Sequence, residues 1–132
     1  MGLFKKAKAE QLITRFAVNL SKDKSVDVLF TPSIFKVAQD HKLDITRGGN
    51  TAFEVMAVYS DILYCAACNY WVIDGNEMKD APFTRADFHT FHADNPQEYV
   101  RVTELALTAF AQVVNSLNEI GKAFNEYGKK KK

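Results

Sequence analysis

The segment from Asn95 to Tyr127, NPQEYVRVTELALTAFAQVVNSLNEIGKAFNEY, decides how the rest of the chain is interpreted. Its apolar residues recur at the spacing of an α-helix and form two neighbouring stripes about 100° apart. The bulky stripe contains Leu107, Phe110, Val114, Leu117 and Phe124. The mostly small stripe contains Val102, Ala106, Ala109, Val113, Ser116, Ile120, Ala123 and Tyr127. A surface helix needs one apolar face to cover its core, so a second stripe predicts a second partner.

This helix is expected to start at Asn95-Pro96, because Asn caps a helix and Pro suits the first turn. Gly128 is expected to end it. The apolar pattern persists through Tyr127, further than a small core would need. We therefore expect the bulky stripe to bind a partner or a second copy. Three small residues would let that neighbour approach closely: Ala106, Ala109 and Ser116. The alternative, that both stripes only cover the core of one domain, remains open.

The N-terminal part predicts a β-hairpin over about residues 12–30. Apolar and polar residues alternate from Leu12 to Leu20 and again from Val26 to Phe30, as in half-buried strands. The polar stretch Ser21 to Ser25 is expected to connect the two strands.

Three further helices are expected between the hairpin and the long helix. One is expected to begin with Thr31 as its N-cap and Pro32 at its first position, and to run to about Lys42. The next two open with the capping-box pairs Thr51/Glu54 and Thr84/Asp87. The helix that follows Thr51 is apolar nearly all round, which predicts a position in the centre of the core. The expected fold class is mainly α: a small N-terminal hairpin followed by a helical bundle with a long C-terminal helix.

Length and charge indicate a single domain over residues 1–128, followed by a lysine tail over residues 129–132. Seven lysines lie near the two ends, which leaves ten of the 17 basic residues against 16 acidic ones. This distribution disfavours a nucleic-acid binder, whose cations usually cluster on one folded face. No signal peptide is visible, and the most hydrophobic window contains Glu54 and Asp61. The sequence therefore predicts a cytoplasmic protein that binds no membrane.

Cys65 and Cys68, together with His89 and His92, form a CxxC…HxxH set with the residue types of a zinc site. The cysteines, however, fall inside a strongly periodic helix, on its least apolar line, which is expected to face a protein contact or water. We therefore interpret them as small residues that allow close helix packing, and expect no metal or cofactor. A zinc-binding or nucleic-acid-binding regulator that uses these four residues and the lysine-rich ends is the alternative hypothesis.

No catalytic pattern accompanies the histidines. His89 and His92 could serve acid–base chemistry beside Asp87 and Asp94, but no nucleophile motif or phosphate loop joins them. They are interpreted as a solvated polar face of a short helix. Gly48-Gly49 is a lone glycine pair, interpreted as a loop hinge. The sequence predicts that the protein is not an enzyme and has no small-molecule substrate.

The order of these elements resembles that of the tail assembly chaperones of long-tailed phages and prophages. The resemblance covers about residues 26–117 and depends on the order and character of the segments, since the family has no catalytic motif. The matching pieces are Ser33 to Lys42, Ala57 to Ala67, Ala81-Pro82-Phe83-Thr84-Arg85-Ala86-Asp87-Phe88, and Asn95-Pro96-Gln97-Glu98 to Val114. The opening strand pair of the family is hard to align with Phe4 to Leu20, and Gly48-Gly49 is a departure.

The resemblance implies a chaperone for tail morphogenesis in the cytoplasm of a bacterial host. Such a protein coats the tape measure protein and helps to recruit tail tube subunits without joining the finished particle. It implies a homo-oligomer and modest, multivalent contacts between helices. The bulky stripe of the last helix is then the expected binding surface.

Overall fold

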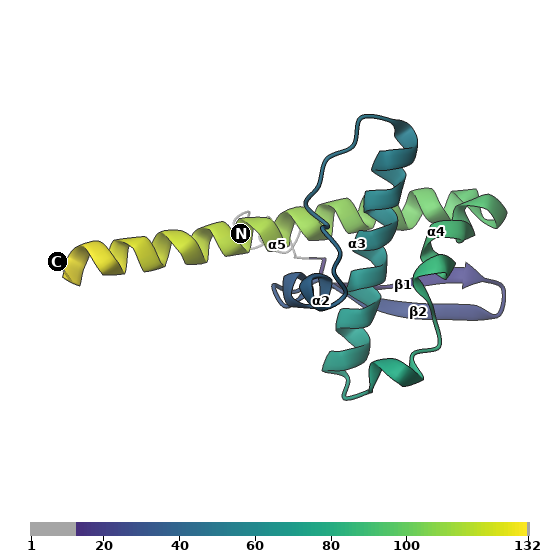
Figure 1. The fold of residues 1–132 in the computed structure, drawn as a ribbon, viewed down its shortest axis with the longest axis horizontal. Helices are drawn as coiled ribbons and strands as arrows, with labels where there is room; N and C mark the ends of the chain where they lie inside the picture. The colour runs from purple at the N-terminus through teal and green to yellow at the C-terminus, as the bar shows by residue number, and fades with distance from the viewer. Residues whose placement is uncertain (1–12, 132) are drawn as a thin grey trace, which may run out of the picture.

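The computed structural model describes residues 13–131, so the expected strand residue Leu12, the basic N-terminal residues and Lys132 lie outside it (Figure 1). The elements follow one another as β1 (Arg15–Ser21), β2 (Lys24–Leu29), α2 (Ile34–Asp40), α3 (Ala52–Ile73), the 3-10 turn η1 (Met78–Asp80), α4 (Arg85–Asp94) and α5 (Pro96–Lys131). The structure is thus mainly helical with an N-terminal hairpin, which confirms the expected fold class.

The hairpin is antiparallel, with Phe16 opposite Val28 and Val18 opposite Val26. Its inward residues are buried, as the alternating pattern predicted: Val18, Leu20, Val26 and Val28. The expected five-residue connection is wrong, because Ser21 pairs with Lys24 and only two residues form the turn. The polar residues around this turn lie largely on the outer side of paired strands, so their polarity marks an exposed face and not a loop.

Helix α3 lies in the middle of the fold and packs against β2, α2, α4 and α5, as its all-round apolar pattern predicted. Ten of its residues are buried. It begins where predicted: the Thr51 hydroxyl accepts a hydrogen bond from the Glu54 amide at 3.2 Å. In a complete capping box the Glu54 carboxylate would accept a hydrogen bond from the Thr51 amide. Here it accepts one from the amide of the preceding residue, Asn50, at 2.6 Å. Among residues 13–131, no helix is both long and apolar enough to cross a membrane.

Helix α2 begins at Ile34, so the expected cap at Thr31 is wrong. The Thr31 hydroxyl is engaged by the Asn69 side-chain amide at 3.0 Å and lies 2.6 Å from the Ser33 hydroxyl. The same Asn69 amide donates to the Leu29 carbonyl at 2.9 Å. Because Asn69 is buried on α3, it fixes the turn that leads from β2 into α2.

The loop before α3 packs more tightly than a hinge would. A Cβ atom added to Gly49 would lie 2.9 Å from the backbone nitrogen of Val55, whereas one added to Gly48 would meet nothing within 4 Å. Gly49 is therefore required by the close approach of the loop to the first turn of α3. Gly48 has no such role within the chain.

Helix α4 begins with the predicted capping box. The Thr84 hydroxyl accepts from the Asp87 amide at 3.2 Å, and the Asp87 carboxylate accepts from the Thr84 amide at 2.8 Å. This start directs Phe88 and Phe91 into the core, where both are buried. Phe88 lies within an aromatic cluster, with ring centroids 5.7 Å from Phe83 and 5.9 Å from Tyr64.

Helix α5 contains 36 residues, and its C-terminal part projects past the other elements (Figure 1). The expected end at Gly128 is wrong, because the helix continues to Lys131. A glycine that ends a helix usually adopts a positive φ. Among residues 13–131, Gly75, just after α3, is the glycine that does so. Neither Gly121 nor Gly128 therefore interrupts α5.

Candidate partner-binding surface

The mostly small stripe of α5 covers the core of the chain itself. Val102, Ala106, Ala109 and Val113 are all buried. The expectation that Ala106 and Ala109 admit a neighbouring chain is therefore wrong, since these alanines let the body of the same chain approach α5. Further along this stripe Ser116, Ile120 and Ala123 are exposed, because the body ends there.

The bulky stripe divides into two parts. Phe110 is half-buried, with its ring centroid 5.6 Å from that of Phe35 on α2, and Val114 is also half-buried. The other three residues are exposed, by 40% at Leu107, 37% at Leu117 and 71% at Phe124. The middle of the predicted binding stripe thus contributes to the core, whereas its C-terminal end faces solvent.

We call residues 116–131 the α5 extension, and its exposed large residues Leu117, Ile120 and Phe124 the extension face. Ile120, which sequence reasoning had assigned to the small stripe, is 46% exposed. Leu117 and Phe124 follow Phe110 at intervals of seven residues, and Ile120 follows Val113 at the same interval. Residues seven apart lie almost in line on a helix. The extension face is therefore a continuation of the face that α5 buries against the body.

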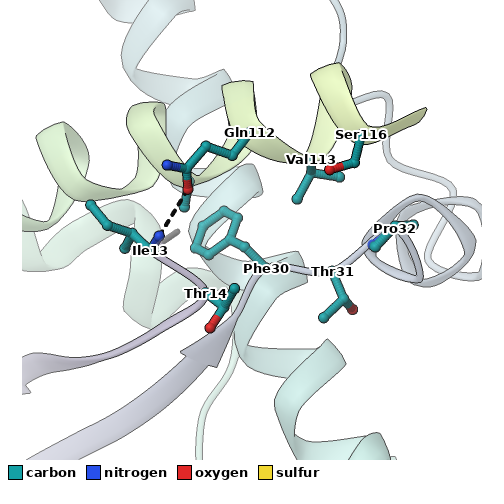
Figure 2. Close-up of a pocket in the computed structure, with 9 residues that line it drawn as sticks. Ile13, Thr14, Phe30, Thr31, Pro32, Gln112, Val113 and Ser116 are labelled. Atoms are coloured by element: carbon teal, nitrogen blue, oxygen red, sulfur yellow. Dashed lines mark hydrogen bonds between the residues drawn. The ribbon is translucent and has the colours of Figure 1, made fainter. Parts of the chain in front are cut away.

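A small cavity lies where the extension leaves the body (Figure 2). It has a volume of about 140 Å³ and is lined by Ile13, Thr14, Phe30, Thr31, Pro32, Ala109, Gln112, Val113 and Ser116. The Gln112 side-chain carbonyl accepts a hydrogen bond from the Ile13 amide at 2.9 Å, which holds the start of the hairpin against α5. A small notch therefore lies at the edge of the body, next to the start of the extension at Ser116.

A second notable site is a buried carboxylate in the middle of α3. The side chain of Asp61 is fully buried and ion-paired with Arg47 at 2.9 Å and Arg85 at 2.8 Å. Its Oδ1 also lies 2.7 Å from His89 Nε2, and because a carboxylate only accepts, His89 donates. The Asp61 carboxylate thus joins the loop before α3 and helix α4 to the central helix.

The charges around Asp61 explain how it remains ionised. Burial alone raises the pKa of a carboxyl group, but the hydrogen bonds from Arg85, His89 and Arg47 outweigh burial and lower the Asp61 pKa to about 2. Both arginine side chains remain partly exposed to water, by 35% at Arg47 and 51% at Arg85. Asp61 is therefore saturated with partners and acts as a structural anchor.

Sequence reasoning missed this anchor and misplaced one of its members. His89 was interpreted as part of a solvated face, but its side chain is only 27% exposed and contacts Asp61. His92 is half-buried with its ring edge against Tyr99, at 5.6 Å between centroids. A charged residue on a helix that is apolar nearly all round was the available signal, because a buried acid requires partners.

The structure separates the cysteines from the histidines of the CxxC…HxxH set. Cys65 and Cys68 are fully buried in α3, so their expected position on a line facing water or a protein contact is wrong. Burial raises the thiol pKa to about 12 for Cys65 and to about 11 for Cys68. Within residues 13–131, no group of three or more His, Cys, Asp or Glu side chains is arranged to hold a metal ion. Both thiols pack as small core residues.

No family model, curated protein or solved structure matches the chain.

Proposed function

We propose that this chain is a non-catalytic tail assembly chaperone of a long-tailed phage or prophage. Its partners would be the tape measure protein and the tail tube protein, in the cytoplasm of the bacterial host. The order of hairpin, short helix, central helix, short helix and long helix agrees with the resemblance stated above. The observation that carries the proposal is the extension face, an exposed apolar surface on a helix that projects beyond its own core.

The extension face has the spacing used by helices that bind in grooves. Leu117, Ile120 and Phe124 occupy positions i, i+3 and i+7, which align on one side of a helix. Three such side chains give a modest contact that forms and releases easily. Several copies acting along one long partner would gain strength through multivalency. This combination suits a protein that covers apolar helical stretches and later leaves them.

The remaining polar groups support a binding role over a catalytic one. The carboxylate of Asp61 is occupied by three side chains, and the buried thiols of Cys65 and Cys68 have raised pKa values that disfavour a reactive thiolate. A zinc site would require the side chains of Cys65, Cys68, His89 and His92 to lie close together. Among the described residues, no group of three or more His, Cys, Asp or Glu side chains is arranged to hold a metal ion, which disfavours zinc binding at this set.

The proposal is tested by placing charge on the extension face. The double substitution Leu117→Glu and Phe124→Glu is expected to weaken binding to the tape measure protein at least about thirtyfold, since it removes two central apolar contacts. The fold should survive, because neither side chain is buried in the body. Phe110 is unsuitable for this test, since its ring packs on Phe35. Binding is measured by titration with purified tape measure segments, and folding by circular dichroism.

The matched control adds two carboxylates to the same helix away from the face, as Asn115→Glu and Asn118→Glu. Both asparagines are exposed, and this variant should bind like the parent chain. Equal affinity of the parent chain and the Leu117/Phe124 variant would contradict the proposed surface. A folded parent chain that binds no tape measure segment would contradict the proposed function.

A further inference from the structure

We propose that the outer edge of β2 binds an extended, basic peptide segment of another protein, which adds a third strand to the hairpin and places one aliphatic side chain in an adjacent aromatic groove. Different residues form this edge and the extension face, so the inference goes beyond the proposed function. It is carried by the outward main-chain groups of Ser25 and Asp27, by the groove that follows them, and by the charge around that groove.

The register of the hairpin shows which main-chain groups point away from it. The Phe30 amide donates a hydrogen bond to the Thr14 carbonyl at 2.7 Å, so these two residues form a hydrogen-bonded pair. Such pairs alternate with non-hydrogen-bonded pairs along an antiparallel ladder. Asp27 and Ser25 lie three and five residues before Phe30, in a register that continues unshifted to Ser25. Their N–H and C=O groups therefore point outward, along the free edge of β2.

The outer edge of β1, by contrast, is covered by side chains of α5. The Asn19 amide donates to the Glu98 carboxylate at 2.8 Å, and the Ala17 carbonyl accepts from Arg101 at 3.0 Å. These bonds reach alternate residues of β1, which agrees with the register. An edge whose polar groups are already engaged offers little to a further strand.

The outer edge of β2 is covered at one end and open at the other. Asn69 engages the Leu29 carbonyl, whereas among residues 13–131 no hydrogen bond engages the outward main-chain groups of Ser25 or Asp27. Two such residues present two donors and two acceptors at the spacing of a strand. A helix has already used its own main-chain groups, so the partner that satisfies this edge is an extended main chain.

An aromatic groove follows the same stretch of β2. It has a volume of about 150 Å³ and is lined by Ser25, Val26, Asp27, Tyr70, Trp71, Pro82 and Phe83. The Trp71 and Phe83 rings meet edge to face, with centroids 6.4 Å apart, and the Trp71 indole N–H is engaged by the Glu77 carbonyl at 2.8 Å. An apolar cavity of about 150 Å³ takes up a molecule the size of benzene. The groove therefore has room for one leucine or valine side chain.

The charge around the groove favours a basic segment. Trp71 lies in the last turn of α3, which contains no basic residue, so the partial negative charge of the helix end is not offset. Asp74 follows that turn, and Asp80 lies two residues before Pro82. Within the described part of the chain, neither of these two acids forms an ion pair. We therefore expect a lysine or arginine near the side chain that enters the groove.

The probe for this site is the acetylated and amidated heptapeptide KVTLTVK, which alternates apolar and polar residues between two lysines. Titration of the full chain, followed by amide NMR, should show binding with a dissociation constant of about 1 mM or tighter. The largest amide shifts are expected at Ser25 and Asp27, whose N–H groups gain an acceptor. A chain that shows no shift at these two amides would overturn the proposal.

The strand-like mode of binding is tested on the peptide, which leaves the fold of the protein untouched. Three peptides carry one N-methyl group each, at the third, fourth or fifth residue. Only every second N–H of an added strand faces β2. The affinity of the fourth-residue peptide should therefore differ at least about tenfold from that of both others. Equal affinities of the three peptides would overturn an added strand.

The matching substitution in the protein is Ser25→Pro, which removes one outward N–H. Proline is tolerated at an edge where the N–H faces outward, and Ser25 is exposed, so the hairpin should remain folded. We expect peptide affinity to fall at least about tenfold. The control Ala17→Pro makes the same change on the edge that α5 covers and should bind like the parent chain. Circular dichroism checks the fold of both variants, and equal affinity of a folded Ser25→Pro variant and the parent chain would overturn the site.

The results also separate this inference from the proposed function. Shifts at Ser25 and Asp27 that grow with the concentration of the chain alone would assign the edge to a second copy and overturn the peptide as its occupant. A chain that binds tape measure segments but not the heptapeptide would overturn this inference alone. A chain that binds the heptapeptide but no tape measure segment would overturn the proposed function and leave the β2 site established.

Discussion

Replacing Asp61 by Asn is expected to lower the free energy of unfolding by about 3 kcal/mol at neutral pH, although the two side chains have the same shape. The Asp61 carboxylate accepts two hydrogen bonds from Arg85 and one each from Arg47 and His89. An Asn side chain has only one acceptor oxygen. Its NH2 group would replace the second oxygen and point N–H bonds at donor groups of Arg47, Arg85 or His89. Urea unfolding at pH 7 measures the loss.

The control for this variant is Asp27→Asn. Asp27 pairs with Arg15 at 3.2 Å, but the Arg15 side chain is 55% exposed and that of Asp27 is 36% exposed, so the change should cost less than about 1 kcal/mol. Equal losses for the Asp61 and Asp27 variants would show that the buried carboxylate does not anchor the loop and α4. The ion pairs of Asp61 would then contribute no more to the free energy of unfolding than the ion pair of a surface acid.

The stability of the parent chain and that of Asp61→Asn should depend differently on pH. The folded-state pKa of Asp61 is lowered from 3.8 to about 2, so its ionised form stabilises the folded protein above the unfolded-state pKa. This contribution is lost as the pH falls from about 4 to about 2, and it amounts to about 2 kcal/mol. The difference in stability between the parent chain and Asp61→Asn should therefore shrink over that interval. A constant difference would contradict the lowered pKa of Asp61.

Replacing Phe88 by Ala is expected to cost about 3–5 kcal/mol, since it leaves a cavity in a closely packed core. The Phe88 ring is fully buried and contacts the rings of Tyr64, Phe83 and Phe91. Phe53 provides a control of the same chemistry, because it is 83% exposed at the start of α3. Phe53→Ala should change the stability by less than about 0.5 kcal/mol. Similar losses in both variants, measured by thermal unfolding, would contradict the position of Phe88 in the core.

The sequence predicted most of the fold because local signals agreed with tertiary packing. The capping pair Thr84/Asp87 opens α4 where expected, and the all-round apolar pattern placed α3 in the centre. One of the errors arises where a distant residue decides local structure. The Thr31 hydroxyl does not cap α2 because Asn69, 38 residues away, engages it. Sequence spacing alone does not show that contact.

The candidate surface was only partly predictable for a similar reason. Periodicity gave two apolar stripes on α5, but it did not show where the body ends along the helix. The structure supplies that boundary, since Val113 is buried and Leu117 is exposed. It also shows that Phe110 belongs to the core contact with Phe35, so the binding surface is shorter than the stripe. The Asp61 anchor required three segments to meet, which no single sequence pattern reports.

Amide hydrogen exchange in residues 115–126 tests directly whether another chain covers this part of α5. A short helix that projects without packing opens readily, so its amides should exchange fast in dilute solution. If another chain covers this part of α5, exchange is expected to slow at least about tenfold at high protein concentration or with added tape measure segment. No slowing is expected in the Leu117→Glu, Phe124→Glu variant. Exchange that is equally fast in the parent chain under all these conditions would contradict such coverage.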